Sequence, residues 1–180
     1  MKDKKIASFL IEITGMLSRG LITVVFVFLF CFSVVTVTGN SMENTLSEND
    51  MLFVSGLFYK PQLGDIVVIS KNYNANTTKI SIKRIVATEG DSVDFKDGFL
   101  YVGGYKINEI YAKNKTDLKN IKNPLKFPLK VPAGMVFVLG DNRENSHDSR
   151  SADFDLVDIR YILGKAYVRL YPFMKYGDFE

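Results

Sequence analysis

Hydrophobic residues are most concentrated near the start of the chain. From Gly20 to Met42 no side chain is charged, and the stretch LITVVFVFLFCFSVVTV is almost wholly apolar. At about 1.5 Å of helical rise per residue, this stretch is long enough to span the roughly 30 Å hydrocarbon core of a bilayer. We therefore predict a transmembrane anchor at residues 20–38, after a cytoplasmic segment at residues 1–19.

Two other interpretations of this stretch are less favoured. A buried core helix is usually shorter and amphipathic, and a cleaved secretory signal has an apolar core of about 7–15 residues before a small-x-small cleavage site. The sequence VVTVTGNSMEN offers no convincing site of that kind. Because basic residues cluster on the cytoplasmic side of membrane spans, Lys2, Lys4, Lys5 and Arg19 place the N-terminus inside the cell. We expect a single-pass plasma-membrane protein whose residues 39–180 are extracellular.

Beyond the anchor, the hydrophobic pattern becomes that of β-strands. Seven short segments rich in Val, Ile, Phe and Tyr are separated by Gly, Asp, Asn or Pro, namely DMLFVSGL, GDIVVIS, KISIKRIVA, DSVDF, FLYVGGYKI, GMVFVLG and GKAYVRLYPF. Asp97-Gly98 and Gly103-Gly104 are hairpin signals. The pattern predicts a mainly β domain of short antiparallel strands, with hairpins and a small cap or loop insertion at about residues 97–133.

Charge and composition exclude several functions. The excess of basic residues lies before residue 20, so the outer domain is close to neutral and lacks the basic footprint of a nucleic-acid-binding protein. The single cysteine, Cys31, lies in the apolar stretch, so the outer domain cannot form an internal disulfide. One histidine, His147, without cysteine cannot supply the ligands of a zinc site. We expect neither a metal nor another cofactor.

Ser41 follows the anchor and is a candidate nucleophile that two different bases can serve. A Ser-His-Asp triad would need His147 together with Asp141 or Asp148 from the same loop, whereas the carboxylate of such a triad normally comes from a separate part of the fold. A lysine can act instead if burial lowers its pKa from about 10.4, because only the neutral amine accepts a proton. Lys83 is the best placed, although most strand lysines lie on a solvated face.

Four motifs in this order carry a resemblance to a known family. They are GNSMENTL just beyond the anchor, GDIVVI, KRIVATEGD and VPAGMVFVLGDNRENSHDSR. Together they resemble the conserved boxes of the bacterial type I signal peptidases, over about residues 36–172. The resemblance implies the β fold of that family and a membrane-bound serine endopeptidase that removes signal peptides with a serine-lysine dyad.

The same resemblance implies roles for individual residues. Ser41 matches the nucleophile, and Lys83 matches the general base. Ser146 is similar to the family serine that hydrogen-bonds and orients the lysine. Asp148 and Arg150 match an ion pair beneath the site.

Neighbouring residues complete the expected site. Arg84 follows the candidate base and Asp141 belongs to the last motif, so we assign both a supporting role. We assign substrate binding to Met42, Ser81 and Ile82, which flank the dyad. The expected partners are the signal peptides of exported precursors and the lipid bilayer.

Three positions depart from the family pattern. Asn44 and Glu89 stand where the family has proline, and because proline fixes φ in a turn, we expect these changes to loosen the presentation of the dyad. Gly39 lacks the hydroxyl that in some members adds an oxyanion donor. The family also includes accessory members that have lost the dyad, so the alternative function is a protein that binds exported pilin or surface proteins to support their assembly.

Overall fold

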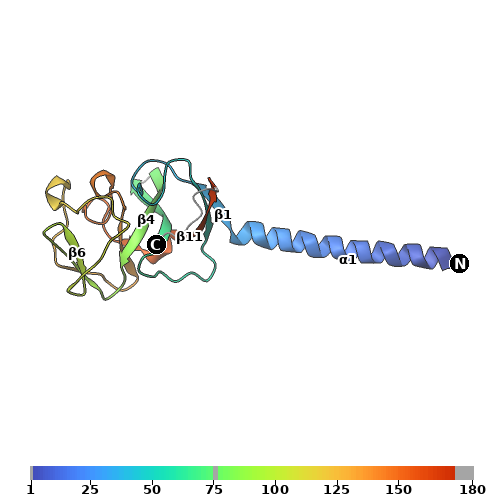
Figure 1. The fold of residues 1–180 in the computed structure, drawn as a ribbon. Helices are drawn as coiled ribbons and strands as arrows, with labels where there is room; N and C mark the ends of the chain where they lie inside the picture. The colour runs from blue at the N-terminus through green and yellow to red at the C-terminus, as the bar shows by residue number, and fades with distance from the viewer. Residues whose placement is uncertain (1, 75–76, 173–180) are drawn as a thin grey trace. The chain divides into compact units, whose positions relative to one another are not determined.

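The computed structural model describes residues 2–74 and 77–172, and the chain divides into two units, Met1–Ser33 and Val34–Glu180. The first unit is helix α1 (Lys2–Cys31) (Figure 1). Within it, Phe9–Leu29 is long and apolar enough to cross a membrane. The helix begins and ends earlier than the expected span of residues 20–38. It ends before the run SVVT (Ser33–Thr36), which pairs into a β-sheet as strand β1.

The described residues after α1 form strands and three-residue 3-10 helices. They are β1 (Ser33–Thr36), β2 (Met51–Ser55), β3 (Ile66–Asn74), β4 (Thr77–Ala87), β5 (Ser92–Lys96), β6 (Phe99–Val102), β7 (Tyr105–Lys106), η1 (Leu118–Asn120), β8 (Leu129–Lys130), β9 (Met135–Leu139), η2 (Arg143–Asn145), β10 (Val157–Asp158), η3 (Ile159–Tyr161) and β11 (Ile162–Tyr171).

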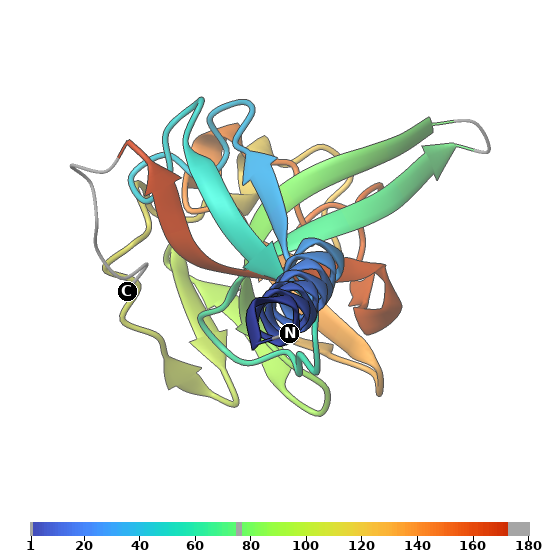
Figure 2. The same cartoon turned by 90° about the vertical axis from the view of Figure 1, so that its right-hand side faces the viewer.

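The strands form two sheets, with the order β1-β2-β11-β3-β4-β9-β10 in the larger and β7-β6-β5-β8 in the smaller. The pairings that link β2 through β10 are antiparallel, as are those of the smaller sheet. In Figure 2, β3 and β4 lie side by side as a long hairpin that projects from the larger sheet. The predicted mainly β fold of antiparallel strands is confirmed.

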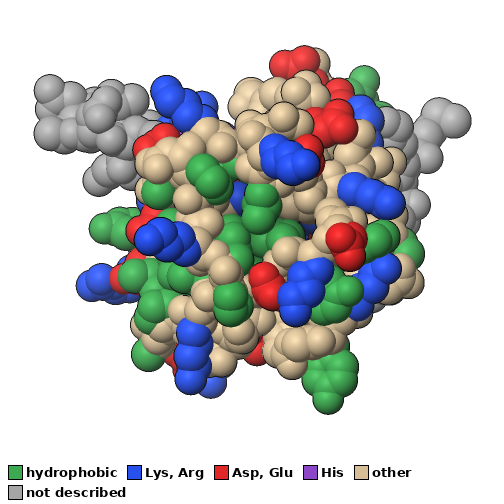
Figure 3. All heavy atoms as spheres, turned by 90° about the vertical axis from the view of Figure 1, so that its left-hand side faces the viewer, with side chains coloured by type: hydrophobic (Ala, Val, Ile, Leu, Met, Phe, Trp, Pro, Cys, Tyr) green, Lys and Arg blue, Asp and Glu red, His purple; other side chains and the backbone are tan. Residues whose placement is uncertain are grey.

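The smaller sheet contains the turn that the sequence pattern predicts between β5 and β6. Asp97 and Gly98 have φ values of 52° and 79°, and two consecutive positive φ values give a two-residue hairpin the right-handed twist of its strands. Lys96 pairs with Phe99 directly before and after this turn. On the face shown in Figure 3, acidic and basic side chains are interspersed around apolar ones.

Three clusters of buried side chains form the core. The first joins residues from the loop after β1, the strands β2 and β3, and Ala166 of β11. Its members Met42 and Leu46 are each 1% exposed. Since a fully buried side chain of this size contributes about 1.5–3 kcal/mol, these two residues fix the loop that carries Ser41. The other two clusters pack on opposite faces of β4 and β9.

Candidate active site

Ser41 lies in a tight turn between β1 and β2, beside the buried side chain of Met42. Within this turn, the backbone N–H groups of Thr45 and Leu46 both donate to the Met42 carbonyl, at 3.1 and 2.8 Å. From the far side, the Asn142 N–H donates to the Ser41 carbonyl at 3.0 Å. The backbone of Ser41 is therefore held by the core on one side and by the segment after β9 on the other.

Lys83 lies on β4 with its amine against the Ser41 hydroxyl. Nζ and Oγ are hydrogen-bonded at 2.8 Å, and the Lys83 residue is only 4% exposed. Burial removes water from the charged amine and lowers the pKa of Lys83 to about 8, and the charge of Asp148 opposes this shift only in part. A useful fraction of the amine is therefore neutral near physiological pH.

Two buried ion pairs support the segments on either side of this contact. Arg84 donates from Nη2 to Asp141 at 2.8 Å, and both side chains are buried. The Thr45 hydroxyl donates to the same carboxylate. Because Arg84 follows Lys83 and Thr45 belongs to the Ser41 turn, this pair connects the strand of the amine to the turn of the hydroxyl.

The second pair lies in the loop around η2. Arg150 donates from Nε to Asp148 at 2.7 Å, and Asp148 accepts the Gly140 N–H at 3.0 Å. Arg150 also donates to the Ser146 carbonyl at 3.2 Å. The expected hydrogen bond between the Ser146 side chain and Lys83 is not formed in this structure. The Ser146 Oγ is buried and has no hydrogen-bond partner among the described residues.

Gly140 explains how these segments approach so closely. A Cβ at this position would lie 2.2 Å from Ser146 Oγ and 2.5 Å from the Ser41 carbonyl oxygen. Any side chain there would push the η2 loop away from the Ser41 turn. Although Gly140 lies in the last family motif, its role was not apparent from the sequence because the close approach involves residues from three segments.

The Ser41–Lys83 contact lies in a cleft of about 260 Å³, lined by residues 37–42, residues 79–83, Asn145 and His147. The expected substrate-binding residues Met42, Ser81 and Ile82 are among them. On this side β4 has an edge that no described strand covers. Its pairing with β9 begins at Arg84, whereas residues 79–83 pair with β3 alone among the described strands. An extended peptide can therefore add to this edge as a further strand.

The arrangement favours the lysine over the histidine as the base. His147 borders the cleft and packs edge-on against Phe154, with ring centroids 5.5 Å apart. Both carboxylates that a triad would need, Asp141 and Asp148, are paired with buried arginines. Within residues 2–74 and 77–172, no group of three or more His, Cys, Asp or Glu side chains is placed to hold a metal ion.

Residues 109–111, in the loop after β7, make contacts with the site that the sequence did not predict. The Tyr111 ring lies over the Arg84 guanidinium, 4.1 Å from its central carbon to the ring centroid, and the Tyr111 carbonyl accepts a hydrogen bond from Asn44 Nδ2 at 3.1 Å. Arg143 of η2 forms a salt bridge with Glu109. The sequence gives no signal for these contacts, because residues 109–111 lie in a loop without periodicity.

A serine hydroxyl held against a buried amine, beside an open strand edge, is the arrangement of a serine peptidase that uses lysine as its base. The chain belongs to the signal peptidase family, peptidase S26, whose profile matches residues 10–171. It is 38% identical over 152 residues to signal peptidase I of Bacillus amyloliquefaciens and 39% identical over 152 residues to signal peptidase I T of Bacillus subtilis (strain 168), in both cases over 80% of this chain and 76% of the relative.

Two further similarities extend the comparison. Signal peptidase IB of Staphylococcus aureus (strain Mu50 / ATCC 700699) is 34% identical over 156 residues, which cover 78% of each chain. The crystal structure of a signal peptidase I from Enterococcus faecalis V583 is 32% identical, with a TM-score of 0.49 over 61% of this chain and 98% of that one.

Proposed function

We propose that this protein is a membrane-anchored serine endopeptidase that cleaves N-terminal signal peptides from exported precursors. The observation that carries the proposal is the 2.8 Å contact between Ser41 Oγ and the buried Lys83 amine. The family and the names of its relatives support the same activity. The candidate span Phe9–Leu29 supports attachment to a membrane. From the basic flank, we further propose that the N-terminus is cytoplasmic and the β domain extracellular.

In the proposed reaction, the neutral Lys83 amine accepts the proton of the Ser41 hydroxyl as Oγ attacks the scissile carbonyl carbon. The backbone N–H of Ser41 donates to the oxyanion that forms, and Gly39 adds no side-chain donor. As the C–N bond breaks, Lys83 returns the proton to the leaving amine, which becomes the N-terminus of the mature protein. Water then attacks the acyl carbon while Lys83 accepts its proton, and Lys83 passes that proton to Ser41 Oγ as the bond between the acyl carbon and Oγ breaks.

The substrate would bind as an extended strand along residues 79–83. Main-chain hydrogen bonds to this edge of β4 would supply affinity. Because the cleft beside Ser41 is small, it suits the small side chains that precede signal-peptide cleavage sites. The accessory function gains no support from the relatives compared above, and we therefore name exported precursors in general, rather than pilins, as the substrate class.

The test is cleavage of a purified secretory precursor in detergent or lipid, with the new N-terminus of the product mapped. Ser41→Ala and Lys83→Met should each abolish a cut that occurs after a small-x-small sequence. Lys71→Met is the matched control. Lys71 is a half-buried lysine whose pKa is also lowered by burial, but its amine donates to the carbonyls of Phe154 and Leu156, outside the cleft. Cleavage that survives Lys83→Met would reject the proposed base, and binding without cleavage would favour the accessory function.

A further inference from the structure

The charged side chains that line the cleft are basic. Among the described residues that line it, Lys79, Lys83 and His147 are basic and none is acidic. Burial lowers the pKa of His147 below its usual range, and Lys83 must lose its charge to act as a base. The lasting positive charge in the cleft therefore belongs to Lys79, which is exposed to solvent.

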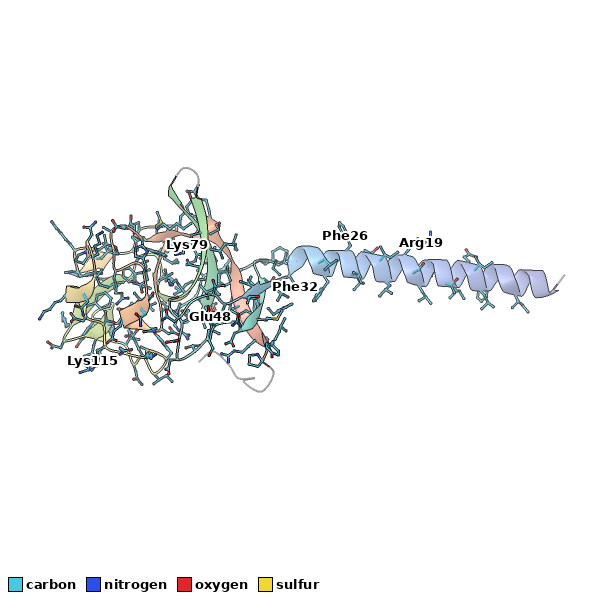
Figure 4. All side chains as sticks on the ribbon, turned by 90° about the horizontal axis from the view of Figure 1, so that it is seen from above. Arg19, Phe26, Phe32, Glu48, Lys79 and Lys115 are labelled. Carbon is cyan, nitrogen blue, oxygen red and sulfur yellow. The ribbon has the colours of Figure 1, made fainter. Side chains whose placement is uncertain are left out.

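Lys79 lies on the edge that a bound peptide would follow. Strand alternation places Lys79 and Lys83 on the same face of β4, four residues and thus about 13 Å apart along the strand. Figure 4 shows Lys79 on β4 and, well apart from it, Lys115. The charge of Lys79 also acts on the Lys83 amine, whose pKa it helps to lower. An extended peptide paired with this edge has a residue every 3.3 Å or so, and one of its side chains therefore comes to lie beside Lys79.

We propose that Lys79 is a specificity-determining residue that favours an acidic side chain in the precursor, three to five residues from the scissile bond. This inference rests on the proposed peptidase function and names a preference within it. A carboxylate there is attracted by the ammonium group of Lys79, whereas a basic side chain is repelled. Because both groups are exposed, the expected preference is modest, about two- to five-fold for Glu over Gln.

The experiment compares kcat/KM for one precursor carrying Glu, Gln or Lys at each position from five residues before to five residues after the cut. The enzymes are the full-length wild type, Lys79→Gln, Lys79→Glu and the control Lys115→Glu, which makes the same change of charge outside the cleft. Ratios between precursors are the readout. Any effect of Lys79 on the pKa of Lys83 changes the rate for all three precursors alike and cancels from the ratio.

We expect the wild type and Lys115→Glu to prefer Glu over Lys at one position in the stated range. The preference should vanish in Lys79→Gln and reverse in Lys79→Glu, and it should shrink at 1 M salt, where charges are screened beyond about 3 Å. An unchanged order of preference in Lys79→Glu would overturn the inference while leaving the peptidase function intact. If no enzyme cleaves any precursor, both the function and the preference are overturned.

Discussion

Replacing Asn44 by the family's proline should damage this protein rather than improve it. Asn44 has a φ of 91°, whereas the proline ring holds φ near −65°. Proline would also drive Glu43 out of its turn conformation towards an extended one. Moreover, the substitution removes the hydrogen bond from Asn44 Nδ2 to the Tyr111 carbonyl. The expectation that the missing proline loosens the loop conflicts with these contacts, because Asn44 provides the constraint itself.

The loss of stability has two parts, which are the strain of the backbone at residue 44 and the loss of the hydrogen bond to Tyr111. Asn44→Gly adopts the positive φ freely and loses only the hydrogen bond, which costs about 0.5–1.5 kcal/mol. Asn44→Ala should cost a further 1–2 kcal/mol or so, because a Cβ disfavours the left-handed region. Asn44→Pro cannot keep the turn at all. Since Ser41 lies three residues away, and a displacement of about 1 Å at a reacting atom costs roughly 100-fold, cleavage should fall by at least that factor.

The assay measures kcat/KM with a secretory precursor, together with thermal unfolding of the full-length chain in detergent. We expect both properties to decrease in the order Gly, Ala, Pro. If Asn44→Pro cleaves as well as the wild type, the turn is not held at positive φ. Our account of how Ser41 is presented would then be wrong.

Three other predictions concern the site itself. The value of kcat/KM should rise as the pH approaches about 8, by about tenfold per pH unit below that value, because the lowered pKa of Lys83 sets the fraction of neutral amine. A profile that is flat between pH 6 and 9 would contradict this role. Gly140→Ala should reduce cleavage at least about 100-fold, because its Cβ would meet the Ser41 carbonyl oxygen at 2.5 Å, whereas Gly20→Ala, with no atom within 4 Å, should cleave normally. Asp141→Ala should lower the free energy of unfolding by about 3–5 kcal/mol, measured by chemical denaturation, since it removes the carboxylate that forms a salt bridge with the buried Arg84. Arg160→Ala, which breaks an exposed pair with Asp158, should have little effect.

The strands made of short runs of Val, Ile and Phe were predictable from the sequence. The runs that became β2, β3 and β9 alternate or concentrate Val, Ile and Phe between turn residues, and the structure buries them as expected. Strand β1 was missed because its valines continue the apolar run of α1 without a polar break. Its pairing in the sheet decides its conformation, and the local sequence does not reveal that pairing.

The candidate residues of the site were predictable from the sequence, but their contacts were not. Spacing alone favoured a solvated Lys83, because a strand lysine usually faces water, and only the resemblance to the family placed it beside Ser41. The contact joins residues 42 positions apart, and the larger sheet brings them together through long-range pairing. Asn44 is a second residue whose role depends on a long-range contact. Its side chain donates to the Tyr111 carbonyl, 67 residues further along the chain, and no pattern around residue 44 indicates that contact.

The uneven pairing of β4 has a consequence for inhibitors. Arg84 pairs with strands on both edges, whereas residues 79–83 pair with β3 alone among the described strands, so the receptor for a bound molecule is a row of main-chain donors and acceptors. Because this row leads to a small cleft, enlarging the side chains of an inhibitor offers little gain in contact area. A macrocycle that is locked in an extended conformation before binding loses less entropy on docking, and it should bind more tightly than a flexible peptide with the same groups.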